Sequence, residues 1–266
     1  MDLDFKGKED YQKDFDPRLY LDTFYSVEGG PLVTGGYLPL MLKNLFTTFA
    51  SGAIRGDTLI DIGSGASIYQ FLSACEFFRE IIASDYSDQC LQELKKWLKK
   101  ESGTFDWSST VKFVCELEGD REKWAEKEEK VRRTVTRVLK CDVTKSNPLE
   151  PLTLPQADCL LSFLCLQSAC MDLESFCSAL KNITSLLKPG GYLVTGGVLG
   201  SSRYRVGQKE FLAFVLEKEI LERAACEAGY VVERLDVQPR IDLSSMYLTN
   251  YQASFFLVAR KQTDMK

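Results

Sequence analysis

The residues best placed to do chemistry are a short glycine-rich run and an acid that follows it. Residues 60–65 read Ile-Asp-Ile-Gly-Ser-Gly, and Asp85 comes about twenty residues later. This spacing predicts a buried strand, a tight glycine turn, a helix whose first N–H groups point at a ligand, and a carboxylate at the tip of the next strand. Such an arrangement is typical of a site for a nucleotide-like cofactor.

The residue at position 68 distinguishes two kinds of nucleotide-like cofactor, a dinucleotide and S-adenosyl-L-methionine. A dinucleotide fingerprint needs a third small residue there, whereas this chain has Ile68. We therefore favour S-adenosyl-L-methionine, whose methionine part can approach the backbone of Gly63, Ser64 and Gly65. Asp85 would accept hydrogen bonds from both ribose hydroxyls. Taken alone, the glycine turn is weak evidence.

Two further features follow in the expected order. Residues 138–143 (Val-Leu-Lys-Cys-Asp-Val) predict a third strand ending in an acid. Asp142 is placed there to accept from an adenine amino group, and Val143 is assigned to the same site. Residues 186–194 predict a helix end, a turn and a strand start. Together these features favour the cofactor site over an ordinary strand–helix turn.

Strands and helices alternate along the chain, which predicts a parallel sheet with helices on both faces. The predicted strands cover 58–62, 81–85, 136–141, 157–163, 192–199, 230–237 and 253–259. The predicted helices cover 69–76, 88–100, 107–117, 121–135, 173–187 and 217–228. The last strand follows its predecessor without a helix, so we expect it to insert antiparallel as a hairpin. The helix at 121–135 carries mixed charges, which predicts a solvated face.

The composition predicts a single domain spanning 1–266. A chain of 266 residues that is 45% hydrophobic can bury a sizeable core, and it has no repeats or Pro/Ser-rich linker. The net charge of −5, without a basic stripe, argues against nucleic acid as a partner. No run reaches the roughly 18 apolar residues of a membrane span, and Met1–Lys6 does not resemble a leader. We expect a soluble, unprocessed, cytoplasmic protein.

Cysteine and histidine usage narrows the possible chemistry. Nine cysteines are an odd number, which favours reduced cytosolic thiols over a disulfide framework. We expect Cys159, Cys165, Cys170 and Cys177 to be small buried hydrophobes. The chain has no histidine. This removes Ser-His and Cys-His nucleophiles and the common histidine metal sites, so no metal is expected.

The chain resembles the vertebrate family of small-molecule N-methyltransferases that includes the nicotinamide, indolethylamine and phenylethanolamine enzymes. The resemblance runs from Tyr11 to Lys261. Its most specific stretches are 57–69, 85–88 (Asp-Tyr-Ser-Asp), 94–101, 105–107 (Phe-Asp-Trp) and 138–143. It implies the Rossmann-like seven-stranded α/β fold of class I S-adenosylmethionine-dependent methyltransferases. It also implies an N-terminal cap or lid at 1–56, a catalytic core at 57–266, a small-molecule amine acceptor and a monomer.

The resemblance also assigns residues to the site. Asp16 and Pro17 predict a helix start, and Tyr20 and Tyr25 on that helix would lie near the methionine carboxylate, beneath a lid that excludes water. A plainer alternative is that this helix only packs on the sheet. The remaining cofactor contacts would be Tyr69, Tyr86, Cys90 and Phe163. The acceptor pocket would contain Tyr20, Phe163, Leu164, Gly197, Tyr204 and Ala213.

Methyl transfer from a sulfonium to a neutral nitrogen is an in-line displacement. It needs alignment and a dry, aromatic-lined cavity rather than a strong base. Ring faces can also hold a cationic product. Glu217 and Glu219, at the start of a predicted helix, are the candidate proton acceptors. The helix dipole alone also favours acids at that position.

The acceptor is where the family pattern fails to transfer. The nicotinamide-methylating members grip the carboxamide with an Asp and a Ser where this chain has Gly197 and Ala213. The phenylethanolamine members have a Glu where Gly200 stands, and Cys90 replaces an Asn of the nicotinamide-methylating members. We therefore expect a broader, indolethylamine-like pocket for arylalkylamines.

Other functions stay open at this point. Nicotinamide or pyridine N-methylation and thioether S-methylation are alternatives within the family. A non-catalytic cofactor-binding protein would keep the glycine turn and lose the substrate cavity. A nicotinamide-dependent oxidoreductase is opposed by Ile68 and by residues 188–191 (Lys-Pro-Gly-Gly).

Overall fold

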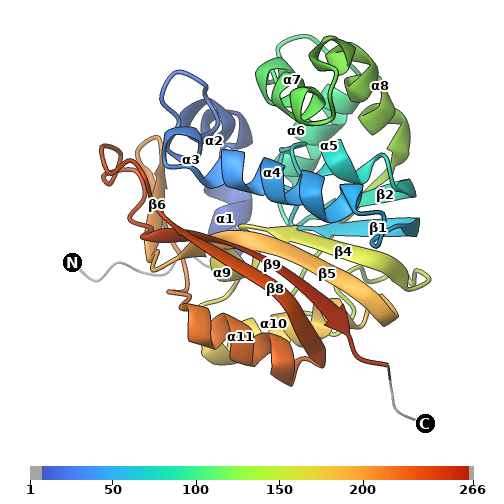
Figure 1. The fold of residues 1–266 in the computed structure, drawn as a ribbon. Helices are drawn as coiled ribbons and strands as arrows, with labels where there is room; N and C mark the ends of the chain where they lie inside the picture. Colours follow the sequence, from blue (N-terminus) through green and yellow to red (C-terminus); the bar gives the residue numbers. More distant parts are fainter. Residues whose placement is uncertain (1–7, 264–266) are drawn as a thin grey trace.

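One seven-stranded sheet organises the chain (Figure 1). The computed structural model describes residues 8–263, and the segment Met1–Lys6 lies outside them. The strand order is β3-β2-β1-β4-β5-β9-β8, and β9 is antiparallel to both β5 and β8. The predicted Rossmann-like sheet and its inserted last strand are confirmed. The strands are β1 Gly56–Ile62, β2 Phe78–Asp85, β3 Val135–Lys140, β4 Ala157–Phe163, β5 Leu187–Leu199, β8 Tyr230–Pro239 and β9 Ala253–Lys261.

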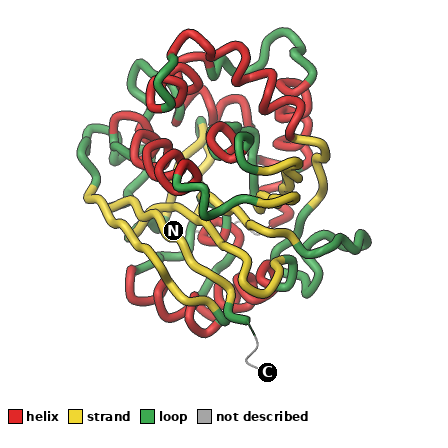
Figure 2. Tube along the Cα trace, turned by 45° about the vertical axis from the view of Figure 1, so that its right-hand side comes forward, coloured by secondary structure: helices red, strands yellow, loops and turns green. Residues whose placement is uncertain are grey.

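Helices cover both faces of the sheet, as Figure 2 shows with helices in red on either side of yellow strands. One face carries α4 Tyr37–Ala50, α5 Phe71–Ala74, α6 Asp88–Leu98, α7 Ser108–Leu117 and α8 Trp124–Thr134, together with the 3-10 turn Arg121–Lys123. The opposite face carries α10 Leu173–Thr184 and α11 Lys218–Glu227. The short helices α1 Lys8–Asp14, α2 Pro17–Phe24, α3 Pro31–Thr34 and α9 Leu166–Ala169 lie at the end of the sheet where the parallel strands stop.

Alternating side chains of the strands feed two hydrophobic clusters. Leu59 belongs to the cluster beneath α4, and its neighbour Ile60 belongs to the cluster above α10. This alternation follows from the two-residue period of a strand. A parallel sheet buried on both faces therefore reads as a continuous apolar run.

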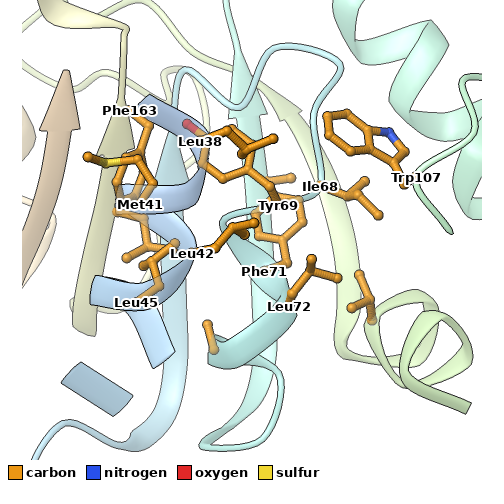
Figure 3. Packing of buried hydrophobic residues seen from close by; sticks show 14 of the residues in the cluster. Leu38, Met41, Leu42, Leu45, Ile68, Tyr69, Phe71, Leu72, Trp107 and Phe163 are labelled. Carbon is orange, nitrogen blue, oxygen red and sulfur yellow. The ribbon is translucent and has the colours of Figure 1, made fainter. Parts of the chain in front are cut away.

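Helix α4 is part of this core. Its Met41 and Leu45 are fully buried, and Figure 3 shows them with Phe163 and Tyr69 between helix and sheet. Gly196 makes this approach possible, because a Cβ there would lie 2.5 Å from Met41 Sδ and 2.7 Å from Phe163 Cε1. The segment before residue 57, predicted as a cap, therefore also contributes side chains to the hydrophobic core.

Several predicted boundaries were wrong. The helix expected at 173–187 ends at Thr184, because β5 already begins at Leu187, which pairs with Ala157. The turn chemistry of residues 188–191 forms an irregularity inside that strand, where Gly190 has φ +76°. The helix expected at 69–76 is only the single turn α5.

The structure also adds a hairpin and corrects the charged helix. Strands β6 Arg203–Val206 and β7 Lys209–Leu212 form a separate two-stranded sheet. In α8, Lys127 is buried rather than solvated, since its Nζ lies 2.5 Å from Glu76 Oε1 and 2.7 Å from Glu118 Oε2. A buried lysine needs such partners. This face of the helix ties α8 to the segments that directly follow α5 and α7.

The nine cysteines are free. Cys159 and Cys170 are buried as expected, while Cys165 and Cys177 are partly exposed. Within residues 8–263, every helix is too short or too polar to cross a membrane.

Candidate active site

A large cavity opens where the parallel strands end. Its empty volume is about 1540 Å³ including the part open to solvent, which is ample for a nucleoside-sized ligand and a second small molecule. The ends of β1, β2, β4 and β5 form one wall, and α1, α2 and the β6–β7 hairpin form the cover. Ligands of open α/β sheets bind at this edge, because loops and helix starts converge there.

The glycine turn after β1 is held tightly. Gly63 has φ +75° and Gly65 has φ +58°, a region that favours glycine. The N–H groups of Gly63 and Ser64 both donate to Ser84 O at 2.8 Å. A Cβ on Gly63 would overlap the side chain of Cys165, so the turn is glycine for packing as well as for conformation. All three predicted turn residues line the cavity.

Asp85 ends β2 and faces the same cavity. Its carboxylate is 6% exposed and accepts from Gly65 N at 2.8 Å and from Ser87 N at 2.7 Å. Burial raises the pKa of Asp85 to about 6, and the backbone donors limit the rise. Each oxygen keeps a free lone pair, so the group can still accept hydrogen bonds from a diol.

Asp142 and Val143 line the cavity beyond the end of the third strand. The strand was predicted at 136–141, and β3 covers Val135–Lys140, so Asp142 follows two residues after the strand. Asp142 Oδ2 lies 2.8 Å from Lys8 Nζ, and Asp142 Oδ1 accepts from Thr144 Oγ1 at 2.6 Å. Burial alone would raise the pKa of Asp142, but the hydrogen bonds from Lys8 and Thr144 hold that pKa below its usual range. The α1 helix is thereby fastened to this corner.

The cover contributes tyrosines. Asp16 Oδ1 caps α2 by accepting from Leu19 N at 2.9 Å, and the helix carries Tyr20 over the cavity. The ring of Tyr25 lies 5.8 Å from that of Tyr20 and 5.7 Å from that of Tyr69. Burial raises the pKa of all three tyrosines, so their hydroxyls stay neutral donors. Such donors suit a carboxylate ligand.

The predicted residues at the other end of the cavity come from β4, its exit and the hairpin. Phe163, Leu164, Tyr204 and Ala213 all line it. Leu164 is one of the non-glycine residues with positive φ, at +55°. Strain of this kind concentrates at functional sites. Tyr204 stacks on Phe211 with ring centroids 5.4 Å apart.

Some predicted residues do not reach the cavity. Glu217 and Glu219 are exposed at the start of α11 and do not line it, so the helix dipole is the sufficient explanation for them. Gly197 faces Gln167 and Phe255 instead. Cys90 is fully buried beneath the site, where its N–H donates to Ser87 Oγ at 3.2 Å. The predicted Tyr86 does line the cavity, and its ring lies 4.7 Å from Lys140 Nζ.

Other lining residues were missed from the sequence. Tyr11 on α1 and Phe15 just after it had a usable signal, because they are aromatic residues four apart in the sequence. The others carry no local signal, since elements distant in the sequence bring them together. The missed residues include Tyr11, Phe15, Gln167, Val198 and Phe211.

Comparisons with known proteins agree with this geometry. The model of the NNMT/PNMT/TEMT family matches residues 3–262. Mouse indolethylamine N-methyltransferase is 51% identical over 255 residues, which is 96% of each chain, and human nicotinamide N-methyltransferase is 51% identical over 98% of each chain. Human phenylethanolamine N-methyltransferase is 42% identical over 85% of this chain and 80% of its own.

Solved structures support the fold. Magnesium protoporphyrin IX methyltransferase from Synechocystis, with bound SAM, superposes with a TM-score of 0.60 at 11% identity. The match covers 98% of this chain and 100% of that chain. A likeness at so low an identity concerns the arrangement of strands and helices.

Proposed function

The chain belongs to the NNMT/PNMT/TEMT family, and from that membership we propose that its cavity transfers a methyl group from S-adenosyl-L-methionine to the nitrogen of a small amine. The observation that carries the proposal is one cavity with two unlike ends. One end offers the glycine turn and two acids, and the other is mostly aromatic and apolar.

The residues at the first end fit the cofactor. The turn at Gly63 and Gly65 lets a ligand approach the backbone, and Asp85 has lone pairs free for ribose hydroxyls. The neutral hydroxyls of Tyr20 and Tyr25 suit the methionine carboxylate. When bound, the cofactor supplies an electrophilic methyl group on a sulfonium.

The residues at the second end position the acceptor. Tyr20 and Tyr204 have ring centroids 6.3 Å apart in an edge arrangement, so lid and hairpin close on the same space. They exclude water and offer ring faces that stabilise a cationic product. In-line alignment then accounts for most of the acceleration that such a displacement needs.

We propose an arylalkylamine-like acceptor rather than nicotinamide. Gly197 lacks a side chain, and Ala213 lines the cavity without a hydrogen-bonding group. A carboxamide would lose its water contacts there, which costs roughly 1–3 kcal/mol for each unpaired group. Pyridine N-methylation and thioether S-methylation remain the second candidates, because the aromatic end suits any soft, uncharged nucleophile.

A methyl-transfer panel tests this function. The protein would be incubated with S-adenosyl-L-methionine and tryptamine, phenylethylamine, nicotinamide, pyridine or a thioether, and S-adenosylhomocysteine would be measured. We expect turnover of the arylalkylamines that disappears in Asp85→Ala. Cofactor binding without transfer to any acceptor would instead indicate a non-catalytic binding protein.

We also propose that residues 1–266 form one domain, with 1–56 as cap and 57–266 as catalytic core, working as a cytoplasmic monomer. The shared hydrophobic cluster of α4 and the sheet supports one domain. The free thiols suit a reducing compartment. Light scattering of the purified protein tests the monomer, and imaging of a tagged copy tests the location.

A further inference from the structure

We propose that Tyr37, the first residue of α4, is a positioning residue that turns the hydroxyl proton of Tyr69 toward the cofactor end of the cavity. Tyr69 lines the cavity and Tyr37 does not, so Tyr37 acts through Tyr69. The inference rests on the proposed methyl transfer, and it adds a residue to the binding of the cofactor's methionine carboxylate.

The two tyrosines share a buried hydrogen bond. The hydroxyl oxygens of Tyr37 and Tyr69 lie 3.0 Å apart, and the residues are 0% and 1% exposed. Their rings meet edge to face, with centroids 6.4 Å apart. Burial holds the pKa of both tyrosines well above the usual range, so each hydroxyl keeps its proton. The bond therefore joins two neutral hydroxyls, each of which can donate or accept.

Burial decides which of the two hydroxyls donates. Among residues 8–263, no group other than Tyr69 bonds to the Tyr37 hydroxyl. If Tyr69 donated, the Tyr37 proton would be buried without an acceptor, which is costly. If Tyr37 donates, both protons can be satisfied, because Tyr69 lines the cavity and its own proton can reach a ligand or water there. Tyr37 is therefore the donor, and the Tyr69 proton is left for the cavity.

Tyr37 can fix this direction because it stands on a rigid element. Helix α4 begins directly after Gly36, which has φ +88°, and its Met41 is fully buried in the core. The ring of Tyr69 also packs edge-on against Phe163, with centroids 5.9 Å apart. Tyr69 is thus held by residues of both α4 and β4. A donor held in this way loses little freedom when it binds a ligand.

The hydroxyl of Tyr69 belongs with those of Tyr25 and Tyr20. The Tyr25 ring lies 5.7 Å from the Tyr69 ring and 5.8 Å from the Tyr20 ring, and all three residues line the cavity. Three neutral donors can share one carboxylate, whose two oxygens offer about four lone pairs. Hydrogen bonds in a chain strengthen one another, so the bond from Tyr37 makes Tyr69 a better donor to an anion. Tyr37 should therefore favour a ligand with a carboxylate over one without it.

The test compares S-adenosyl-L-methionine with its decarboxylated analogue by calorimetry. Tyr37→Phe keeps the ring and removes the hydroxyl, so the dissociation constant for S-adenosyl-L-methionine should rise about three- to tenfold. The dissociation constant for the analogue should change by less than about twofold, because the analogue lacks the anion. Equal weakening of both ligands would show that Tyr37 acts through packing, and would overturn the inference while leaving cofactor binding intact.

Tyr230→Phe is the matched control. Tyr230 is a 1% exposed tyrosine whose hydroxyl also bonds to a hydroxyl, since it accepts from Thr184 Oγ1 at 2.9 Å. It begins β8 and does not line the cavity. The Tyr230→Phe protein should bind both ligands as tightly as the wild type. A loss of affinity for S-adenosyl-L-methionine equal to that in Tyr37→Phe would overturn the inference.

A double variant tests the route through Tyr69. Tyr69→Phe should raise the dissociation constant for S-adenosyl-L-methionine about tenfold, since it removes a donor to a charged group. Adding Tyr37→Phe should then change that constant by less than about twofold, because the Tyr37 hydroxyl has lost the group through which it acts. Additive losses in the double variant would contradict a route through Tyr69.

The remaining outcomes separate this inference from the proposed function. If Tyr37→Phe fails to fold, Tyr37→Met removes the hydroxyl with a flexible side chain and should give the same pattern. If the wild type binds S-adenosyl-L-methionine and the decarboxylated analogue equally well, the tyrosines do not hold the carboxylate, and the inference fails while methyl transfer stands. If the wild type binds neither ligand, the proposed function and this inference fail together.

Discussion

The two ends of the cavity are built in different ways. The cofactor end is made of consecutive strand ends and is fixed by backbone groups, as when Asp85 accepts from Gly65 N and Ser87 N. The acceptor end is assembled from the β4 exit, β5 and the hairpin, and is shaped by side chains such as Gln167 and Tyr204. Backbone-built sites tolerate few changes. A side-chain-built site can alter its ligand by one or two substitutions while the fold stays the same.

The largest effect should come from the glycine turn. Gly63→Ala forces alanine into φ +75° and places its Cβ in the space of Cys165, which should cost about 2–5 kcal/mol of unfolding free energy. Gly65→Ala is the matched control, because nothing lies within 4 Å of its Cβ and only the conformational cost of about 1–2 kcal/mol remains. Denaturant unfolding measures both. Equal losses of unfolding free energy in the two variants would show that the Cys165 side chain moves aside at little cost.

A second prediction concerns pH and the buried carboxylate of Asp61, which lies in β1 just before the glycine turn. Asp61 is 1% exposed, its Oδ2 accepts from Gln70 Nε2 at 3.0 Å, and its Oδ1 has no partner. Burial raises the pKa of Asp61 to about 7. A raised folded pKa contributes stability that is complete below about pH 3.8 and is lost as the pH rises through about 7.

Asp61→Asn removes this titration. The unfolding free energy of the wild type should fall relative to the variant by on the order of 4 kcal/mol between pH 4 and 8, because each unit of the raised pKa of Asp61 corresponds to about 1.4 kcal/mol. Only the slope against pH is compared, because the asparagine also changes the hydrogen bonds. Parallel curves would mean that Asp61 is ionised normally in the folded state.

A third prediction addresses the cofactor end directly. Asp85→Ala removes a charged acceptor, so affinity for S-adenosyl-L-methionine should fall at least about tenfold by calorimetry. Asp88→Ala is the control, since Asp88 is exposed and pairs with Lys140 at 2.9 Å. The Asp88→Ala protein should bind S-adenosyl-L-methionine as tightly as the wild type. An unchanged dissociation constant for Asp85→Ala would remove Asp85 from the site.

The difference between the cofactor end and the acceptor end also explains which features could be predicted from the sequence. The glycine turn, Asp85 and the seven core strands were predictable, because each depends on residues close together in the chain. The β6–β7 hairpin was missed although its turn contains Gly207 at φ +59°, a recognisable hairpin signal. Gln167 could not have been found, since its position depends on an absent side chain at Gly197, thirty residues further on. Helix α4 was also not predicted, because its sequence lacks the polar face that marks an amphipathic helix.

The smallest effect should come from giving the acceptor end a carboxamide contact. Ala213→Ser adds a hydroxyl to the cavity lining, and one neutral hydrogen bond of about 0.5–1.5 kcal/mol should raise kcat/KM for nicotinamide about two- to tenfold. Gly197→Asp alone should lower it, because its Cβ would collide with Gln167 Oε1 and Phe255.

Shortening the glutamine should remove the closer of these two collisions. In Gly197→Asp with Gln167→Ala, the carboxylate gains the space of the amide, and adding Ala213→Ser should then help more than in the wild-type background, since both groups act on one ligand. The kcat/KM for nicotinamide across these variants measures the coupling. If Gly197→Asp alone already improved nicotinamide methylation, Gln167 would not be fixed in the place that the structure gives it, and the acceptor end would adapt more freely than its packing indicates.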